Sequence, residues 1–254
     1  MPDTGAPYEI PFLDGTELVR AYPQFSEDLA DQIVAGLDRG FRFAGTRYYT
    51  SSGTFAKADP LGTGDIGLRA VIVRVFGAGG GGRGVAFVAS RNPIGAGGGG
   101  AGGYAQSFIL AESLGTSETV TCGAGGSPNS NGGSSSFGTL VASNGGFAGG
   151  LMSDLAGSQV RRGGFGGSAT AGDFQVSGSP GGTGAISDLR VAGGAGGSSL
   201  FGSGGQSLDD NSTGTNGAPG GLGGGGSGAA RLSGDAEVDG GSGGDGLIIV
   251  DCFV

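Results

Sequence analysis

Carboxylates are the side chains that could act in catalysis, because the sequence contains no histidine. Without histidine, the usual general base and any Ser-His-Asp or Cys-His arrangement are missing. The acidic residues come closest together at Asp209-Asp210, at Asp235, Glu237 and Asp239, and at Asp245. Two facing carboxylates can hydrolyse a glycoside, but nothing in the local sequence distinguishes these from solvated loop charge. We therefore expect no enzymatic activity.

Three further motifs could bind a ligand, and each lacks its required context. Residues 77–82 match G-x-G-x-x-G after a strand-like run, but the helix and the later acidic residue of a dinucleotide site do not follow. Residues 240–247, GGSGGDGL, resemble one calcium-binding β-roll repeat, which works only in tandem copies. Residues 211–213 form a glycosylation sequon without a secretory leader. We expect no cofactor and no metal.

The two cysteines, Cys122 and Cys252, each lie in an apolar, strand-like run. Such residues are typically buried reduced thiols. A disulfide is the alternative if their strands pair. Two cysteines without histidine fall short of the four ligands of a structural zinc site.

Glycine dominates the composition, with 65 of 254 residues. Each glycine inside a helix costs about 1 kcal/mol relative to alanine, so long helices are excluded from most of the chain. The irregular glycine spacing excludes collagen. An apolar fraction of 36% with 14% charged residues disfavours disorder. The net charge of −9 argues against nucleic acid and against a polybasic membrane surface. No apolar stretch reaches a membrane span, and the start lacks a signal peptide, so we expect synthesis in a cytoplasm.

The N-terminal residues predict an attachment segment over 1–40. Residues 1–23 are extended and punctuated by proline, and residues 24–38 form the one convincing helix. Ser26 can cap this helix, and acidic residues occupy its first turn. Its apolar stripe consists of Phe25, Leu29, Ile33 and Leu37. A lone short helix is marginal in water, so the stripe must pack on the later domain, on other copies or on a partner.

The rest of the chain is expected to be β-structure. Residues 41–60 alternate around a turn at 51–53 and predict a β-hairpin. Further strands are predicted at 68–76, 104–110, 118–122, 134–142 and 247–254. The first and last of these open and close one domain over 61–254, and we expect them to be neighbours in one sheet. The last is apolar almost throughout, as for a strand inside a sheet or sandwich.

Eight glycine tracts separate these strands, and two interpretations of them are open. They could be flexible linkers, but the strands would then have little to pack on. They could instead adopt polyglycine II, an extended left-handed helix with three residues per turn. We therefore predict a mostly β fold: β-sandwich-like strands with polyglycine II-type segments and a short N-terminal helix.

The order of several motifs is similar to the glycine-rich domain of phage tail-fibre and minor tail proteins. These motifs are SGTF, LRAVIVRVFGAGGGG, GGYA, ETVTCGAGG, SSSFG and DGLIIV, spread over about residues 50–254. Residues 7–33 are similar to the leading segment of many phage tail proteins. The chain also resembles, more distantly, the distal tail-fibre adhesins of T-even phages, in which segments between glycine motifs touch the receptor.

This resemblance implies a virion tail-fibre or tail-tip protein, made in the host cytoplasm, that recognises a host-surface glycan or outer-membrane protein. Its N-terminal segment would join other tail proteins, with a homotrimer as the expected assembly. The segments between glycine tracts supply the candidate receptor-binding residues: Arg161, Arg162, Asp209, Asp210, Asn211 and Arg231. A purely structural tail component is the first alternative, and an ice-binding or cell-surface glycine-rich protein is the second.

Overall fold

The computed structural model describes residues 40–85, 93–150, 159–187, 190–210, 214–232 and 236–254. The chain divides into two compact units, Met1–Arg42 and Phe43–Val254. The predicted helix over 24–38 lies outside the described residues, and so does its stripe of Phe25, Leu29, Ile33 and Leu37. The strands described here belong to the second unit.

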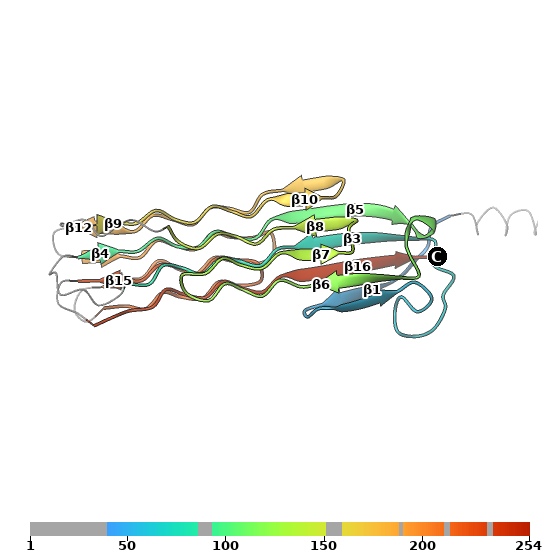
Figure 1. Cartoon of the computed structure of the whole chain (residues 1–254), viewed down its shortest axis with the longest axis horizontal. Coiled ribbons are helices and arrows are strands. Elements are labelled where there is room, and N and C mark those ends of the chain that lie inside the picture. Colours follow the sequence, from blue (N-terminus) through green and yellow to red (C-terminus); the bar gives the residue numbers. More distant parts are fainter. Residues whose placement is uncertain (1–39, 86–92, 151–158, 188–189, 211–213, 233–235) are drawn as a thin grey trace, which may run out of the picture. The chain divides into compact units, whose positions relative to one another are not determined.

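Two five-stranded antiparallel sheets form one end of this unit (Figure 1). The first sheet has the order β1 (Phe43–Tyr49), β16 (Leu247–Phe253), β3 (Ala70–Phe76), β5 (Tyr104–Leu110) and β11 (Phe174–Val176). The second has the order β10 (Ala169–Ala171), β8 (Val141–Ser143), β7 (Ser135–Phe137), β6 (Ser117–Thr121) and β2 (Gly53–Ala56). A short 3-10 turn, η1 (Ala111–Ser113), follows β5.

Two small sheets lie at the opposite end of the glycine tracts (Figure 1). One consists of β12 (Ala185–Ser187), β13 (Arg190–Ala192) and β14 (Asp209–Asp210). The other has the order β15 (Ala230–Arg231), β4 (Ile94–Gly95) and β9 (Gln159–Val160), and its β4–β9 pair is parallel. Strands of the two small sheets contact each other. We call this region the far end, and the end formed by the five-stranded sheets the strand end.

The main core lies between the two large sheets. In β3, Val71, Val73 and Val75 alternate with outward residues and are fully buried, as the period of two along a strand requires. They share one cluster with Phe55 and Phe137 of the second sheet, whose rings are 5.3 Å apart, edge to face. Burying such side chains typically contributes about 1.5–3 kcal/mol each. The sequence prediction of a mostly β fold is thus confirmed.

The last strand, β16, is central to the first sheet. It pairs with β3 through a register that opposes Val250 to Val73 and Cys252 to Val71. Residues 247–252 are all buried, which explains why this strand is apolar almost throughout. The predicted neighbourhood of residues 68–76 and 247–254 is therefore confirmed.

The predicted β-hairpin over 41–60 is wrong. The strand β1 pairs with β16, and β2 pairs with β6 in the other sheet. The strand β16 is buried on both faces and needs a hydrogen-bonding partner on each side. Because β3 pairs with only one edge of β16, β1 pairs with the other edge. Residues 50–52 then connect β1 to β2 in the second sheet.

The single strand predicted over 134–142 is also wrong, since these residues form β7 and β8 with a turn between them. Gly138 has a φ of +53° in this turn, a conformation that glycine adopts without strain. The N–H of Leu140 donates to the carbonyl of Phe137 over 3.1 Å and closes the turn. The strand-like residues on both sides of Gly138, SSSF and TLVA, concealed this reversal.

Hydrogen bonds between the glycine tracts repeat every third residue. The N–H groups of Ala96, Gly99 and Gly102 donate to the carbonyls of Ala229, Gly226 and Gly223. The intervening residues of tract 95–103 turn to other neighbours, donating to residues 179–182 and 144–147. Its carbonyls accept from residues 77–83, 161–167 and 194–197. One tract therefore bonds to six others, which satisfies backbone groups that no side chain could reach.

Glycine is required here because the backbones approach one another too closely for a Cβ atom. A Cβ on Gly82 would overlap the carbonyl oxygen of Ser227. The conflict is with backbone rather than with a side chain that could move aside. The tracts 77–84, 95–103 and 223–228 are buried almost throughout. The abundance of glycine in these tracts thus follows from close packing of one chain against itself.

Candidate functional site

The far end brings together most of the charged residues that the sequence singled out. Arg231 lies in β15, Arg161 follows β9, and β4 runs between these two strands. Asp209 and Asp210 form β14 in the adjoining small sheet. Asn211 lies outside the described residues. Charged residues from three separate segments are thus gathered at one end of the glycine tracts.

Two of the three candidate arginines are buried. Arg161 is 7% exposed and Arg231 is 1% exposed. The backbone of Arg161 continues the hydrogen bonding between β9 and β4, because its N–H donates to the carbonyl of Gly95 over 3.0 Å. Its own carbonyl accepts from the N–H of Gly184, also over 3.0 Å. These two arginines place positive charge beneath the surface and present little area to a ligand. Buried charge of this kind is maintained only with compensating contacts.

The exposed candidates are Arg162 and Asp209. Asp209 pairs with Ala192 at the edge of its sheet, and its carbonyl accepts a 3.3 Å hydrogen bond from Thr215. The guanidinium carbon of Arg162 lies 5.7 Å from the ring centroid of Phe165, within the range of a cation–π contact. These two side chains are available to a ligand, with opposite charges.

A side groove next to Arg162 was not predicted from the sequence. It has a volume of about 380 Å³, and its side chains come from four glycine-rich segments. The side chains that line it are those of Arg83, Asn129, Asn131, Phe147, Arg162 and Phe165. The sequence did contain an indication of this groove, because the tracts NGGFAGG and RRGGFGG each carry one phenylalanine. In a closely packed glycine array, such a side chain can only point outwards.

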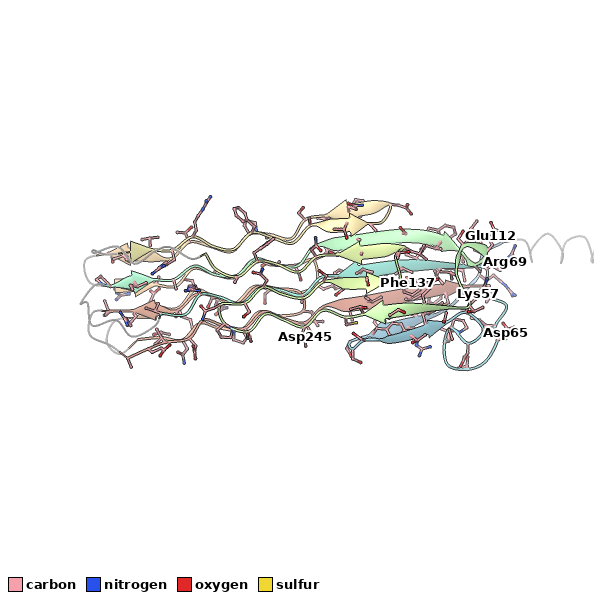
Figure 2. The ribbon with its side chains drawn as sticks, viewed as in Figure 1. Lys57, Asp65, Arg69, Glu112, Phe137 and Asp245 are labelled. Atoms are coloured by element: carbon pink, nitrogen blue, oxygen red, sulfur yellow. The ribbon has the colours of Figure 1, made fainter. Side chains whose placement is uncertain are left out.

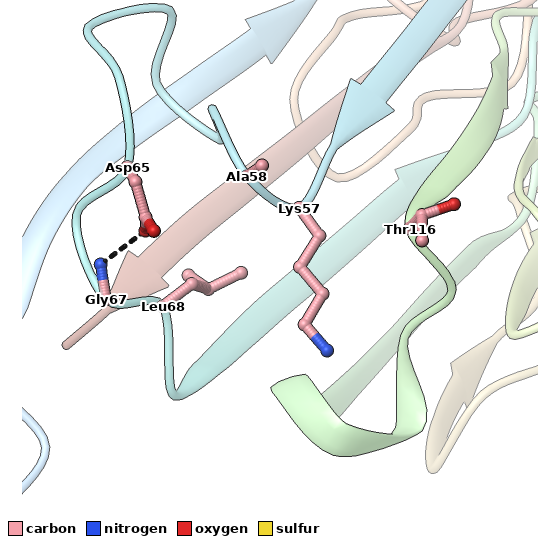
Figure 3. Close-up of a pocket in the computed structure, with 6 residues that line it drawn as sticks. All are labelled: Lys57, Ala58, Asp65, Gly67, Leu68 and Thr116. Atoms are coloured by element: carbon pink, nitrogen blue, oxygen red, sulfur yellow. Dashed lines mark hydrogen bonds between the residues drawn. The ribbon is translucent and has the colours of Figure 1, made fainter.

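A second pocket of about 470 Å³ lies at the strand end (Figure 3). The side chain of Lys57 extends along it, near Leu68 and Thr116. Asp65 is already engaged, since its carboxylate accepts a 2.8 Å hydrogen bond from the N–H of Gly67. One lysine beside an occupied carboxylate offers little chemistry. Other charged residues gather at the same end, including Arg69 and Glu112 (Figure 2).

Both cysteines are free thiols. Burial raises the pKa of Cys252 to about 11, and the negative charge of Asp251 adds to the rise. Burial also raises the pKa of Cys122, whose thiol donates to the carbonyl of Tyr49 over 3.1 Å. Since the thiolate is the reactive form, both cysteines are poor nucleophiles at neutral pH.

The described residues contain no group of three or more His, Cys, Asp or Glu placed to hold a metal ion. Within the same part of the chain, no helix combines the length and apolar character needed to cross a membrane. Asp245, the one carboxylate of the GGSGGDGL motif, lies along the glycine tracts (Figure 2). Its side chain accepts a 2.7 Å hydrogen bond from the N–H of Gly125. This carboxylate therefore joins two tracts.

Neither a scan against protein-family models nor a search of the curated proteins found a match to this chain.

Proposed function

We propose that this chain is a non-enzymatic tail-fibre or tail-tip protein of a phage virion, which recognises a molecule on the host surface. The observation that carries the proposal is the separation of its two ends. The strand β1 lies at the strand end, and β9 and β12 lie at the far end (Figure 1). The exposed candidate Arg162 follows β9 by two residues, and Asp209 belongs to β14, in the same small sheet as β12. Packed glycine tracts connect the two ends.

The glycine tracts are assigned to the polyglycine II conformation. The three-residue spacing of the hydrogen bonds supports this assignment, because polyproline II-like helices have three residues per turn. A tract of this kind projects N–H and C=O groups in three directions, and tract 95–103 donates to three neighbours and accepts from three. Such a column is stiff, since each strand is held by bonds to several others.

A stiff column suits the display of short variable segments. Binding residues concentrate on loops that a rigid scaffold positions. The far end carries exposed Asp209 on an edge strand, with Arg162 two residues beyond β9. A host glycan or an outer-membrane protein offers the hydrogen-bonding groups that these side chains can meet. The order of glycine motifs shared with phage tail proteins supports the same role.

Attachment to the tail is assigned to residues 1–40, with synthesis in the host cytoplasm and assembly as a homotrimer. The outward face of the first sheet supports self-association. It exposes several large apolar side chains, namely those of Phe43, Tyr48, Phe108, Leu110 and Phe174. Monomeric proteins rarely leave a large contiguous apolar face in water. A native mass of one chain at micromolar concentration would rule out the trimer.

A purely structural tail component is the alternative, in which another protein touches the host. The burial of Arg161 and Arg231 favours this alternative, because buried side chains contribute little to an interface. Substitution of the exposed residues Arg162 and Asp209 therefore distinguishes host recognition from a purely structural role.

Adsorption of virions that carry an Arg162→Ala, Asp209→Ala double substitution tests the proposal. Both side chains are exposed, so folding and incorporation should persist. We expect a loss of adsorption of about tenfold or more, in line with the loss of one or two binding contacts. Glu112→Ala, an exposed substitution at the strand end, is the matched control. Intact virions that adsorb normally with the double substitution would leave only the structural role.

A further inference from the structure

The side groove next to Arg162 combines charged, amide and aromatic side chains. The described residues that line it include two arginines, two asparagines and two phenylalanines, and none of them is an Asp or a Glu. The chain as a whole has a net charge of −9. The exposed guanidinium of Arg162 is thus a local positive charge on an acidic protein, and it favours a negatively charged ligand.

The two phenylalanines form an apolar surface at this groove. Phe147 is 50% exposed and Phe165 is 64% exposed. Their backbones are adjacent, since the N–H of Phe147 donates to the carbonyl of Phe165 over 2.9 Å. Large exposed aromatic side chains on rigid backbone are typical of binding surfaces, because they offer area at a low cost in conformational entropy.

Both asparagines are fixed by their own backbone contacts. The side-chain oxygen of Asn129 accepts from the N–H of Gly84 over 2.8 Å, and that of Asn131 accepts from the N–H of Ala148 over 2.9 Å. Since a backbone N–H can bond only to the oxygen, the orientation of each amide is determined. Each NH₂ group is left as a double donor. Asn129 also has a φ of +69°, an uncommon backbone conformation that places this side chain.

Arg162 supplies the exposed charge of the groove. Its guanidinium carbon lies 5.7 Å from the ring centroid of Phe165, in cation–π range, and its N–H groups can donate to an acceptor. Arg83 is anchored by its backbone, whose N–H donates to Gly97 over 2.9 Å. Guanidinium groups match carboxylate and phosphate oxygens through paired hydrogen bonds.

We propose that this groove binds an acidic saccharide, with a sugar ring against Phe147 and Phe165 and its carboxylate or phosphate at Arg162. The asparagine NH₂ groups then donate to ring hydroxyls. The volume of about 380 Å³ lies within the usual range of small-ligand sites, about 300–1,000 Å³. The net charge of −9 disfavours a long polyanion such as nucleic acid, whereas a sugar acid brings one or two charges. Binding of an acidic saccharide at this groove does not require that the chain be part of a virion.

Saturation-transfer NMR on the full chain tests this site with four probes. Galacturonate carries a carboxylate, glucose 6-phosphate carries a phosphate, and galactose and glucose are their neutral counterparts. We expect at least one acidic sugar to receive saturation from the protein, with at least about fivefold weaker transfer to its neutral counterpart. The acid that binds identifies the acidic group. If neither acidic sugar binds, or if the neutral sugars bind as well, the proposal is wrong.

Substitutions then locate the site. Arg162→Ala and Phe165→Ala should each raise the dissociation constant of the acidic sugar about tenfold. Both side chains are exposed, so an unchanged melting transition should accompany the loss. Arg190→Ala, which removes an exposed arginine in β13, is the matched control and should bind normally. Binding that survives both groove substitutions, or that Arg190→Ala weakens equally, would overturn the assignment.

Discussion

Gly99 and Gly80 pack so closely that a Cβ atom on Gly99 would overlap the carbonyl oxygen of Gly80. The two residues belong to different glycine tracts, which hydrogen bonds hold side by side, as from the N–H of Gly80 to the carbonyl of Gly100 over 2.8 Å. This contact is backbone against backbone. The glycine content of the chain is therefore a packing requirement, and single substitutions can test it.

Gly99→Ala is expected to lower the free energy of unfolding by about 3 kcal/mol or more, at the upper end of overpacking effects. Gly53→Ala is the matched control, because the nearest atoms to its Cβ would be those of the Tyr49 ring at 3.8 Å. The control should be neutral or slightly stabilising, since alanine restricts the unfolded chain. Urea denaturation of both variants measures the difference. Equal stabilities would mean that the glycine tracts do not pack as described.

Phe137→Ala tests the core between the two large sheets. Phe137 is fully buried and contacts the ring of Phe55, so truncation should cost about 3–5 kcal/mol. Leu200→Ala removes an apolar side chain that is 66% exposed, and should cost about 1 kcal/mol or less. Calorimetric melting of the two variants distinguishes these expectations. Similar effects of both substitutions would contradict the sandwich core.

Asp251 forms an ion pair with Arg74 and accepts a 2.6 Å hydrogen bond from the hydroxyl of Thr46. Its carboxylate is largely buried. Asp251→Ala leaves the arginine without this partner and should cost about 2–4 kcal/mol, as for partly buried pairs. Glu112→Ala, at an exposed site of the same charge, should change stability by about 0.5 kcal/mol or less. Chemical denaturation of the two variants at neutral pH provides the comparison, and a loss below 1 kcal/mol for Asp251→Ala would contradict the role assigned to the pair.

Stability should fall at alkaline pH because of Cys252. Its pKa rises from 9.0 to about 11 on folding, so the folded state holds this proton more tightly than the unfolded state does. The resulting stabilisation is fully present below pH 9 and is lost as the pH rises towards 11. Two pKa units correspond to a loss of up to about 2–3 kcal/mol. Burial raises the pKa of Tyr49 and Cys122 as well, which acts in the same direction.

Denaturation midpoints at pH 8 and pH 10.5 measure this loss. Cys252→Ala should lose less stability over that interval than the natural chain, whatever its stability at pH 8. An unchanged pH dependence in Cys252→Ala would show that the thiol does not ionise as described.

The sequence predicted those parts of the fold that side-chain patterns determine. The alternation of Val71, Val73 and Val75 predicted the inward face of β3. The apolar run of 247–254 predicted a central strand beside it. The partner of β1 could not be predicted, because residues 41–60 alternate equally well for a hairpin and for pairing with a distant strand. Which glycine tracts lie side by side could not be predicted either, since glycines carry no side chain to distinguish one neighbour from another.

The candidate site was only partly predictable for a similar reason. The sequence showed charged residues between glycine tracts but not that several of them, Arg161, Asp209 and Arg231, reach the same end. The burial of Arg161 and Arg231 depends on how the two small sheets pack, which no local pattern encodes. The side groove depends on four segments that are separate in sequence, and only the isolated phenylalanines Phe147 and Phe165 indicated it.

The most direct test of the proposed role is the position of this chain in a virion. A small epitope inserted within residues 211–213, next to β14, can be labelled with antibody-coated gold and imaged in purified particles. The proposal predicts gold at the tail, on the part that points away from the capsid. Purified virions that contain no chain of this kind, or that carry the gold only on the capsid, would contradict it.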